Sequence, residues 1–338
     1  MTDAKRVLTI QNLRTYFKTP NGLVKAVDAV SFHLDKGEIL AIVGESGCGK
    51  SVTAQSILGL IKVPPAQMSG SIVFKGKELI GSSADEYRKI RGMHISMIFQ
   101  EPMSAFDPLY TIGQQLMEVA KAHMPWSESE AKERIIDSLK KVHIPEPEKR
   151  YNEYPHEMSG GMLQRIMIAM ALLTSPEIII ADEPTTALDV TIQAQVLNLM
   201  QELQESYNGS IIFITHDLGV VAEVADRVLV MYAGKIVEKA SVYDLFANPL
   251  HPYTSGLLTS RVKREYKKEG KDLPYIKGYV PKADEFSQGC RFNTRCPYKT
   301  EKCEKETPPE IEATSGHTVA CFLYEGSDSN ENLANTKP

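Results

Sequence analysis

Several features are missing from this 338-residue sequence, and each absence narrows what the protein can be. No apolar run approaches the roughly 18–20 residues that a membrane-spanning helix needs. The N-terminal stretch MTDAKRVLTI lacks the apolar core of a signal peptide. We therefore expect a chain that is made and kept in the cytoplasm and that acts at a membrane only through partners.

The sequence also lacks a basic excess and has little cysteine. Lys and Arg number 38 against 43 Asp and Glu, a formal net charge of −5, which disfavours a nucleic-acid binder. Only Cys48 precedes residue 290, and the other cysteines cluster near the C-terminus: Cys290, Cys296, Cys303 and Cys321. In a large cytosolic protein such a cluster indicates a metal or iron–sulfur site more readily than disulfides.

Short apolar runs alternate with helix-forming segments over most of the chain. We predict strands from Val7–Thr15 through Phe32–Leu34, at Ile39–Val43, Glu177–Ala181 and Ile211–Thr215, and a hairpin of Val228–Tyr232 with Lys235–Glu238. We predict helices at Lys50–Ile61, Ser159–Thr174, Leu188–Ser206 and Leu218–Ala225, with helix formers enriched over Glu86–Ile144. This alternation predicts an α/β fold with a mainly parallel sheet covered on both faces.

The composition changes after His251. Arg261–Lys271 is strongly charged and predicts a solvated linker or an exposed helix. From Gly278 onward the chain is rich in Pro, Gly and Cys, shows little periodicity, and would need a staple to hold one shape. The polar end of the chain predicts disorder.

A phosphate-binding pattern follows the strand predicted at Ile39–Val43. The run Gly44-Glu45-Ser46-Gly47-Cys48-Gly49-Lys50-Ser51 fits G-x-x-x-x-G-K-[ST] between a buried strand and a helix. Glycines let backbone N–H groups curl around phosphate oxygens, and the helix N-terminus adds partial positive charge. We expect Lys50 to reach the β- and γ-phosphates of ATP and Ser51 to bind Mg²⁺, with Val52 next in the site.

Cys48 occupies an unconstrained position of this loop. A small filler residue is the simpler interpretation. A thiol that the positive site makes reactive is the alternative.

Two carboxylates end the apolar strand at Ile178–Ala181. We expect Asp182 to hold Mg²⁺ and Glu183 to polarise the attacking water, because phosphoryl transfer needs a metal-bound acid and an unliganded neighbour. A helix cap is the alternative, since Pro184 and Thr185 follow. His216, after another apolar strand, can hydrogen-bond a γ-phosphate or water, although a histidine at a strand end is often structural.

The run Ser159-Gly160-Gly161-Met162 resembles the signature motif of ABC ATPases, with Met158 and Met162 where Leu and Gln are commoner. The resemblance implies that this segment contacts the γ-phosphate of ATP bound by a facing subunit. Gln100 resembles the Q-loop, which senses Mg²⁺ and γ-phosphate beside the membrane subunits. Asp189 falls in the D-loop position and His216 in the H-switch position.

Phe17 falls where the ABC family stacks an aromatic ring on adenine. Tyr16 is the neighbouring candidate, and a plain core aromatic remains an alternative.

The tail resembles the C-terminal extension of oligopeptide and dipeptide importer ATPases, with the spacing C-x5-C-x6-C-x17-C. In some of those proteins four such cysteines hold a [4Fe–4S] cluster, so the resemblance implies one on Cys290, Cys296, Cys303 and Cys321. Zn²⁺ and free or paired thiols stay open, although the absence of a C-x2-C knuckle weakens zinc.

The resemblance implies a P-loop ABC-type ATPase domain over residues 5–260, of mixed sheet, antiparallel β subdomain and helical subdomain (about 86–175). A Cys-rich extension (261–325) and a disordered tail (326–338) would follow. Implied partners are a second ATPase subunit, different or identical, two membrane permeases and, indirectly, an extracytoplasmic peptide-binding protein. Such a subunit lies peripherally on the cytoplasmic face of the membrane. Import of nickel or an oligosaccharide, and a non-transport ABC ATPase, are the alternatives.

Overall fold

The computed structural model describes residues 5–20, 22–186, 190–260, 275–283 and 285–326. The chain forms two compact units, each assembled from several stretches. The first unit holds residues 1–8, 34–39 and 74–214, and the second holds residues 9–33, 40–73 and 215–338.

Parallel strands lie in the first unit, in the order β8-β7-β6. They are β6 (Ile95–Ile98), β7 (Ile178–Asp182) and β8 (Ser210–Thr215). The register places Ala181 of β7 opposite Ile98 of β6 and Phe213 of β8. All residues of β7 and β8 are buried, as expected for parallel strands that are covered on both faces.

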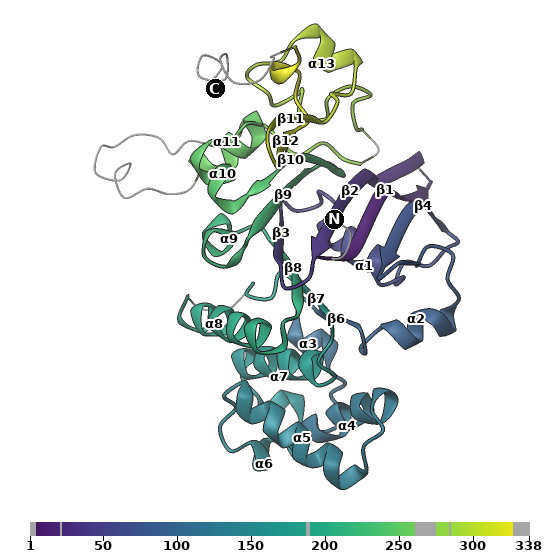
Figure 1. Cartoon of the computed structure of the whole chain (residues 1–338), viewed down its shortest axis with the longest axis vertical. Coiled ribbons are helices and arrows are strands. Elements are labelled where there is room, and N and C mark those ends of the chain that lie inside the picture. The colour runs from purple at the N-terminus through teal and green to yellow at the C-terminus, as the bar shows by residue number, and fades with distance from the viewer. Residues whose placement is uncertain (1–4, 21, 187–189, 261–274, 284, 327–338) are drawn as a thin grey trace, which may run out of the picture. The chain divides into compact units, whose positions relative to one another are not determined.

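Helices make up most of the rest of the first unit (Figure 1). They are α2 (Ala84–Ile90), α3 (Pro102–Ala105), α4 (Ile112–His123), α5 (Glu128–Lys141), α6 (Pro147–Arg150), the 3₁₀ turn η2 (Pro155–Glu157), α7 (Gly160–Leu172) and α8 (Val190–Tyr207), beside the short strand β5 (Lys77–Glu78). Helices α4, α5 and α7 pack in sequence, α4 on α5 and α5 on α7. Polar caps fix where they begin, because Thr111 and Gln114 form a capping box at α4 and Ser159 caps α7.

The second unit combines two sets of strands. One set has the order β2-β1-β4 and the other the order β11-β12-β10-β9-β3. Their bounds are β1 (Arg6–Thr19), β2 (Gly22–Asp35), β3 (Ile39–Val43), β4 (Ala66–Phe74), β9 (Arg227–Tyr232), β10 (Lys235–Ser241), β11 (Ile311–Thr314) and β12 (His317–Val319). The helices are α1 (Lys50–Ile57), α9 (Leu218–Val224), α10 (Val242–Ala247), α11 (Pro252–Thr259), α13 (Glu301–Lys305) and η3 (Phe322–Tyr324).

Most of the predicted elements are confirmed, although some strands were missed and one helix ends early. The strand β4 was not predicted, and β6 lies inside the segment expected to be helical, because its four residues are too few to show a periodicity. Helix α1 ends at Ile57 and not at Ile61, since Gly59 adopts a left-handed φ of 59°.

The segment after Gly278 holds its shape by joining the fold around it. Strand β12 pairs with β10, with Val319 opposite Glu238. The buried Glu238 carboxylate accepts hydrogen bonds from the backbone N–H groups of Leu250 (2.8 Å) and His251 (2.9 Å) and bonds His317 Nε2 at 2.8 Å. An added strand and a buried polar network therefore anchor this segment, and the expectation that a staple also holds it stays a prediction.

An aromatic cluster adds an apolar anchor to the same segment. The Phe292 side chain is 2% exposed, and its ring packs edge-on against Tyr232 at a centroid distance of 5.2 Å. Tyr253 and His251 lie at 5.5 and 5.6 Å from the same ring. Burial of one Phe side chain contributes about 2 kcal/mol to the free energy of folding. Phe292 therefore stabilises the packing of its loop against the end of β9.

Some predictions lie outside the described residues. They are the linker or helix at Arg261–Lys271, the D-loop Asp189 and the disorder of residues 327–338. The domain boundaries at 260 and 325 stay predictions. Among the described residues, no helix combines the length and apolarity that crossing a bilayer requires.

We predict that His251 makes the fold sensitive to acid. Burial lowers the pKa of His251 to about 4, and its Nδ1 accepts the N–H of Tyr253 at 3.0 Å. The unfolded chain takes up this proton near pH 6.5, so stability is lost as the pH falls from 6.5 toward 4. Between pH 7 and pH 5 the wild type should lose about 2 kcal/mol more than His251→Asn, which keeps a capping acceptor. Denaturant titrations at both pH values measure this, and parallel losses in the two proteins would contradict it.

Candidate functional site

The phosphate-binding loop of the second unit is shaped by backbone contacts that exclude side chains. Gly49, the N-cap of α1, has a φ of 104°, and a Cβ there would lie 2.4 Å from the carbonyl oxygen of Ala26. A Cβ on Gly44 would lie 2.2 Å from the carbonyl oxygen of Met231. Only glycine fits at either position, because the loop packs directly against two other stretches of backbone at the start of α1.

Lys50 lies within the curl of this loop. Its side chain is buried, and Nζ donates to the carbonyl oxygens of Gly44 at 2.8 Å and Glu45 at 3.3 Å. A buried ammonium beside backbone N–H groups at a helix N-terminus forms a site for polyanionic phosphate.

Cys48 matches the filler interpretation of its position. Its side chain is fully buried, and burial raises the pKa of the thiol. A buried, protonated thiol is a poor nucleophile, so the alternative of a reactive thiol is not favoured.

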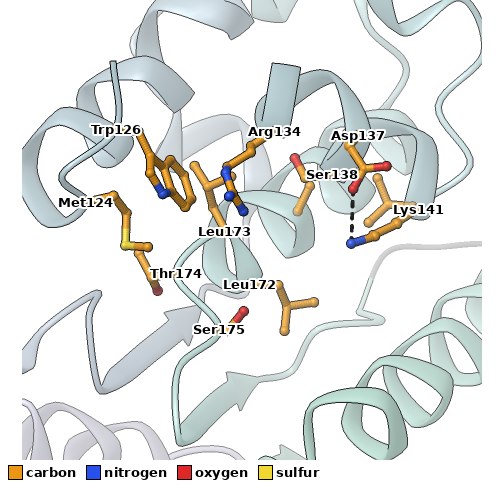
Figure 2. Close-up of a pocket in the computed structure, with 12 residues that line it drawn as sticks. Met124, Trp126, Arg134, Asp137, Ser138, Lys141, Leu172, Leu173, Thr174 and Ser175 are labelled. Carbon is orange, nitrogen blue, oxygen red and sulfur yellow. Dashed lines mark ion pairs between the residues drawn. The ribbon is translucent and has the colours of Figure 1, made fainter. Parts of the chain in front are cut away.

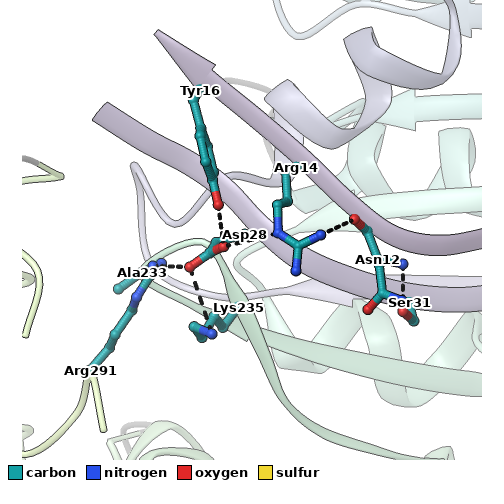
Figure 3. Close-up of polar contacts among 8 residues, drawn as sticks. All are labelled: Asn12, Arg14, Tyr16, Asp28, Ser31, Ala233, Lys235 and Arg291. Carbon is teal, nitrogen blue, oxygen red and sulfur yellow. Dashed lines mark hydrogen bonds and ion pairs between the residues drawn. The ribbon is translucent and has the colours of Figure 1, made fainter. Parts of the chain in front are cut away.

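The two aromatic candidates of β1 differ in their surroundings. The hydroxyl of Tyr16 donates to Asp28 Oδ1 at 2.5 Å, and Arg291 also bonds the Asp28 carboxylate (Figure 3). Burial, followed by the bond to Asp28, raises the pKa of Tyr16 to about 12. Phe17 is half-buried, and as its neighbour on a strand it faces the other side.

Asp28 is the centre of this network. Burial alone would raise the pKa of its carboxyl group, but the hydrogen bond from Tyr16 and the nearby cations outweigh burial and lower it. Lys235 Nζ lies 3.6 Å from Oδ2, and Arg14 Nε lies 3.9 Å from Oδ1 (Figure 3). The Tyr16 hydroxyl therefore rests on an ionised carboxylate surrounded by positive charge.

The first unit brings Gln100 and Glu183 together at the ends of β6 and β7. Gln100 Nε2 donates to Glu183 Oε2 at 3.2 Å, and Thr186 Oγ1 donates to the same oxygen at 2.9 Å. Glu183 has a left-handed φ of 48°, and its N–H donates to the carbonyl oxygen of Ile214 at 2.9 Å. A non-glycine residue in this region is strained and is common at functional sites.

Asp182 ends β7 and is buried, with 6% of its surface exposed. The capping alternative requires the acidic pair to stand directly at the start of a helix. The helix that follows, α8, begins only at Val190, so the pair does not cap it. His216 follows β8 and is exposed, while the next residue, Asp217, caps α9 through Gly219 N–H at 2.7 Å.

The signature segment forms the N-terminus of α7 in the first unit. Ser159 and Gly160 are exposed, and the Ser159 side chain accepts the N–H of Met162 at 3.3 Å. An added Cβ on Gly160 would meet nothing within 4 Å. The segment therefore presents a capped helix N-terminus to solvent, a surface suited to an anion from outside the unit.

The four C-terminal cysteines line one cavity of about 190 Å³ in the second unit. All are free thiols. Burial raises the pKa of Cys290 to about 11 and that of Cys321 to about 12, and it also raises the pKa of Cys296. Among the described residues, no group of three or more His, Cys, Asp or Glu is arranged to hold a metal ion. The cavity collects the four predicted cysteines, and their role as metal ligands stays a prediction.

A larger cavity, about 330 Å³, lies between the ends of α4, α5 and α7 in the first unit (Figure 2). Arg134 stacks over Trp126 at 4.6 Å, and Lys141 pairs with Asp137 at 3.0 Å. Its lining includes none of the predicted site residues.

Sequence reasoning missed two residues that contact the phosphate-binding loop. Arg295 pairs with the Glu45 carboxylate, and the Tyr253 hydroxyl accepts the N–H of Glu45 at 2.9 Å. Both partners lie more than 200 residues away in the sequence, and no local pattern marks such a contact.

Comparison with known proteins gives two family matches. Residues 27–186 match the family described as ABC transporter, and residues 237–303 match the oligopeptide/dipeptide transporter, C-terminal region. Among solved structures, the dimeric ATP-binding cassette MJ0796 bound to ADP and Pi is similar, with a TM-score of 0.63 and 27% identity over 70% of this chain and 98% of that one.

Relatives match along nearly the whole chain. The oligopeptide transport ATP-binding protein AppD of Bacillus subtilis is 51% identical, over 94% of this chain and 97% of that protein. The OppD protein of Escherichia coli, also an oligopeptide transport ATP-binding protein, is 47% identical over 94% of each. The chain therefore belongs to the family of ABC transporter ATP-binding proteins, in the group that carries the oligopeptide/dipeptide transporter C-terminal region.

Proposed function

We propose that this chain is the ATP-hydrolysing subunit that powers the import of dipeptides or oligopeptides by an ABC transporter. The observation that carries the proposal is the presence, in one chain, of the ABC family region and the oligopeptide/dipeptide C-terminal region. The relatives named above are peptide-transport ATP-binding proteins. The ATPase motifs carry no information on the transported substrate. The C-terminal region and the relatives favour peptides over nickel or an oligosaccharide.

Each site residue has one role in this proposal. Lys50 and N–H groups of the loop between Gly44 and Ser51 would bind the β- and γ-phosphates, while the Glu45 N–H is taken by Tyr253. Ser51 and Asp182 would hold Mg²⁺, which when bound neutralises phosphate charge. Glu183 polarises the attacking water, and Gln100 orients Glu183 through its 3.2 Å hydrogen bond.

Two ATPase subunits, different or identical, face each other in the proposed engine. The segment Ser159–Met162 would contact ATP held by the partner subunit, and Asp189 is proposed for the D-loop. His216 contacts the γ-phosphate, and Phe17 stacks on adenine, with Tyr16 as the alternative. ATP binds the closed pair of subunits more tightly than the open pair. This difference in affinity drives the conformational change of the attached permeases.

An apolar surface of the first unit supports contact with membrane permeases. Phe99 (43% exposed), Met103 (57%), Leu109 (79%) and Tyr110 (53%) follow one another along the chain beside Gln100. Large apolar side chains gathered on a surface mark interaction sites. Through this surface the chain would lie peripherally on the cytoplasmic face of the membrane. A peptide-binding protein on the other side of the membrane would be an indirect partner.

We predict that Glu183→Gln binds Mg-ATP but hydrolyses it at least about a hundredfold more slowly, because the amide cannot accept a proton from water. The variant should trap the paired subunits with ATP bound, which size-exclusion chromatography with radiolabelled ATP detects. Thr186→Val, which removes only one hydrogen bond to the same carboxylate, is the matched control and should keep most activity. Turnover of Glu183→Gln at the wild-type rate would refute the role of Glu183.

We predict that Lys50→Ala loses ATP affinity, while Lys36→Ala, an ordinary substitution outside the loop, does not. The substitution removes the buried cation that the loop holds against the phosphates. Equilibrium dialysis with Mg-ATP measures the affinity of each. Equal affinities of Lys50→Ala and the wild type would contradict the assignment.

The four-cysteine cavity supports the assignment of a cluster, because all four thiols line one space of about 190 Å³. A [4Fe–4S] cluster fills the space between four thiolates with its own iron and sulfide. We propose Cys290, Cys296, Cys303 and Cys321 as its ligands, with the role of clipping the C-terminal segment; Zn²⁺ is the alternative.

Anaerobic purification should therefore yield a brown protein with close to four iron and four sulfide per chain. Cys303→Ser should lose most of this iron, while Cys48→Ser, a matched change outside the cavity, should keep it. Equal iron contents in these two variants, or zinc in place of iron, would overturn the cluster assignment.

A further inference from the structure

A charged contact joins the C-terminal segment to the phosphate-binding loop. Arg295 faces Glu45 as a fork, with Nη1–Oε2 at 2.5 Å and Nη2–Oε1 at 3.1 Å. The Arg295 side chain is 3% exposed and that of Glu45 is 31% exposed. A bidentate arginine–carboxylate pair that is largely shielded from water is strong and directional, unlike the exposed ion pairs of the surface.

The backbone on both sides of Arg295 is fixed, so the contact has a rigid base. Phe292 is buried in the aromatic cluster, and the N–H of Cys296 donates to its carbonyl oxygen at 3.0 Å. Arg295 Nε donates to the carbonyl oxygen of Lys277 at 3.1 Å. The guanidinium is therefore held in place independently of Glu45.

The Glu45 end of the contact is fixed as well. Its N–H donates to the hydroxyl of Tyr253, which belongs to the same aromatic cluster as Phe292. Its carbonyl oxygen accepts from Lys50 Nζ at 3.3 Å. Glu45 thus connects the cluster to the lysine that the loop encloses.

Electrostatics explain why this carboxylate requires a partner. Glu45 follows Gly44 directly in a loop whose proposed ligand carries several negative charges. An uncompensated carboxylate near a triphosphate would repel it, because like charges oppose each other strongly where water is partly excluded. Arg295 supplies the compensating positive charge and holds the carboxylate turned toward itself.

We propose that Arg295, from the C-terminal segment, is a positioning residue of the ATP site that acts through Glu45. It neutralises the Glu45 carboxylate and holds the first turn of the phosphate-binding loop in shape. The inference rests on the proposed ATP-binding function, and it makes the C-terminal segment part of the nucleotide site.

Binding of Mg-ATP to the purified full chain tests the inference by calorimetry, alongside the KM and kcat of ATP hydrolysis by the chain assembled with its partner subunits. Arg295→Ala should weaken ATP binding about tenfold and raise the KM, with kcat at saturating ATP close to wild type. Arg295→Lys keeps the positive charge but loses the bidentate contact. Its affinity for ATP should lie between those of the wild type and Arg295→Ala. Lys302→Ala removes an ion pair with Glu325 in the same segment, away from the loop, and should bind ATP as the wild type does.

The double variant Glu45→Gln/Arg295→Ala separates positioning from a merely structural role. With the carboxylate gone, loss of Arg295 should have no further effect, so the double variant should bind ATP as Glu45→Gln alone does. Wild-type affinity in Arg295→Ala would overturn the inference, and so would equal losses in Arg295→Ala and Lys302→Ala or a double variant as weak as Arg295→Ala. Failure of the wild type itself to bind ATP would instead refute the proposed function. If Arg295→Ala does not fold, Arg295→Lys measured with and without the Glu45→Gln substitution gives the same comparison.

Discussion

The close approach of one backbone to another at Gly44 and Gly49 is the constraint on which the nucleotide site depends. Side chains at these positions would collide with the carbonyl oxygens of Met231 and Ala26. The loop thereby packs against the end of β9 and the strand β2, and Lys50 Nζ donates to the loop carbonyl oxygen of Gly44 at 2.8 Å. The anion site is a product of this packing, because glycine alone permits it and the neighbouring strands enforce it.

The C-terminal segment shows how a stretch with few apolar residues of its own can be ordered. It contributes β12 to the strand β10, the ring of Phe292 to an existing aromatic cluster, and His317 to the buried carboxylate Glu238. Each contact is made with a core that other parts of the chain form. Burial of side chains against that core offsets the entropy lost when the segment becomes ordered, which the segment could not achieve alone. The same anchoring brings Arg291 to Asp28 and Arg295 to Glu45.

The sequence predicted the elements with strong local patterns. The phosphate-binding loop, the strand ending at Asp182 and the helix behind Ser159 each depend on residues adjacent in the chain, and the structure places Gln100 on Glu183 as two strand ends of one parallel sheet require. It did not predict β6 or β12, whose few residues become strands only because a partner strand is present. It also missed Arg295 on Glu45, since a contact across 250 residues depends on the completed fold and leaves no trace in spacing or composition.

Glu183 of the first unit and Glu45 of the second have surroundings that would suit two different roles. Glu183 accepts hydrogen bonds from the amide of Gln100 and the hydroxyl of Thr186, two neutral donors that orient its carboxylate. A carboxylate oriented in this way can still accept a hydrogen bond from water and polarise it. Glu45 is paired instead with a guanidinium, which cancels its charge and removes it from proton transfer. Under the proposed function, Glu183 would polarise water, while the pairing of Glu45 with Arg295 would keep the Glu45 carboxylate from opposing the binding of a polyanion.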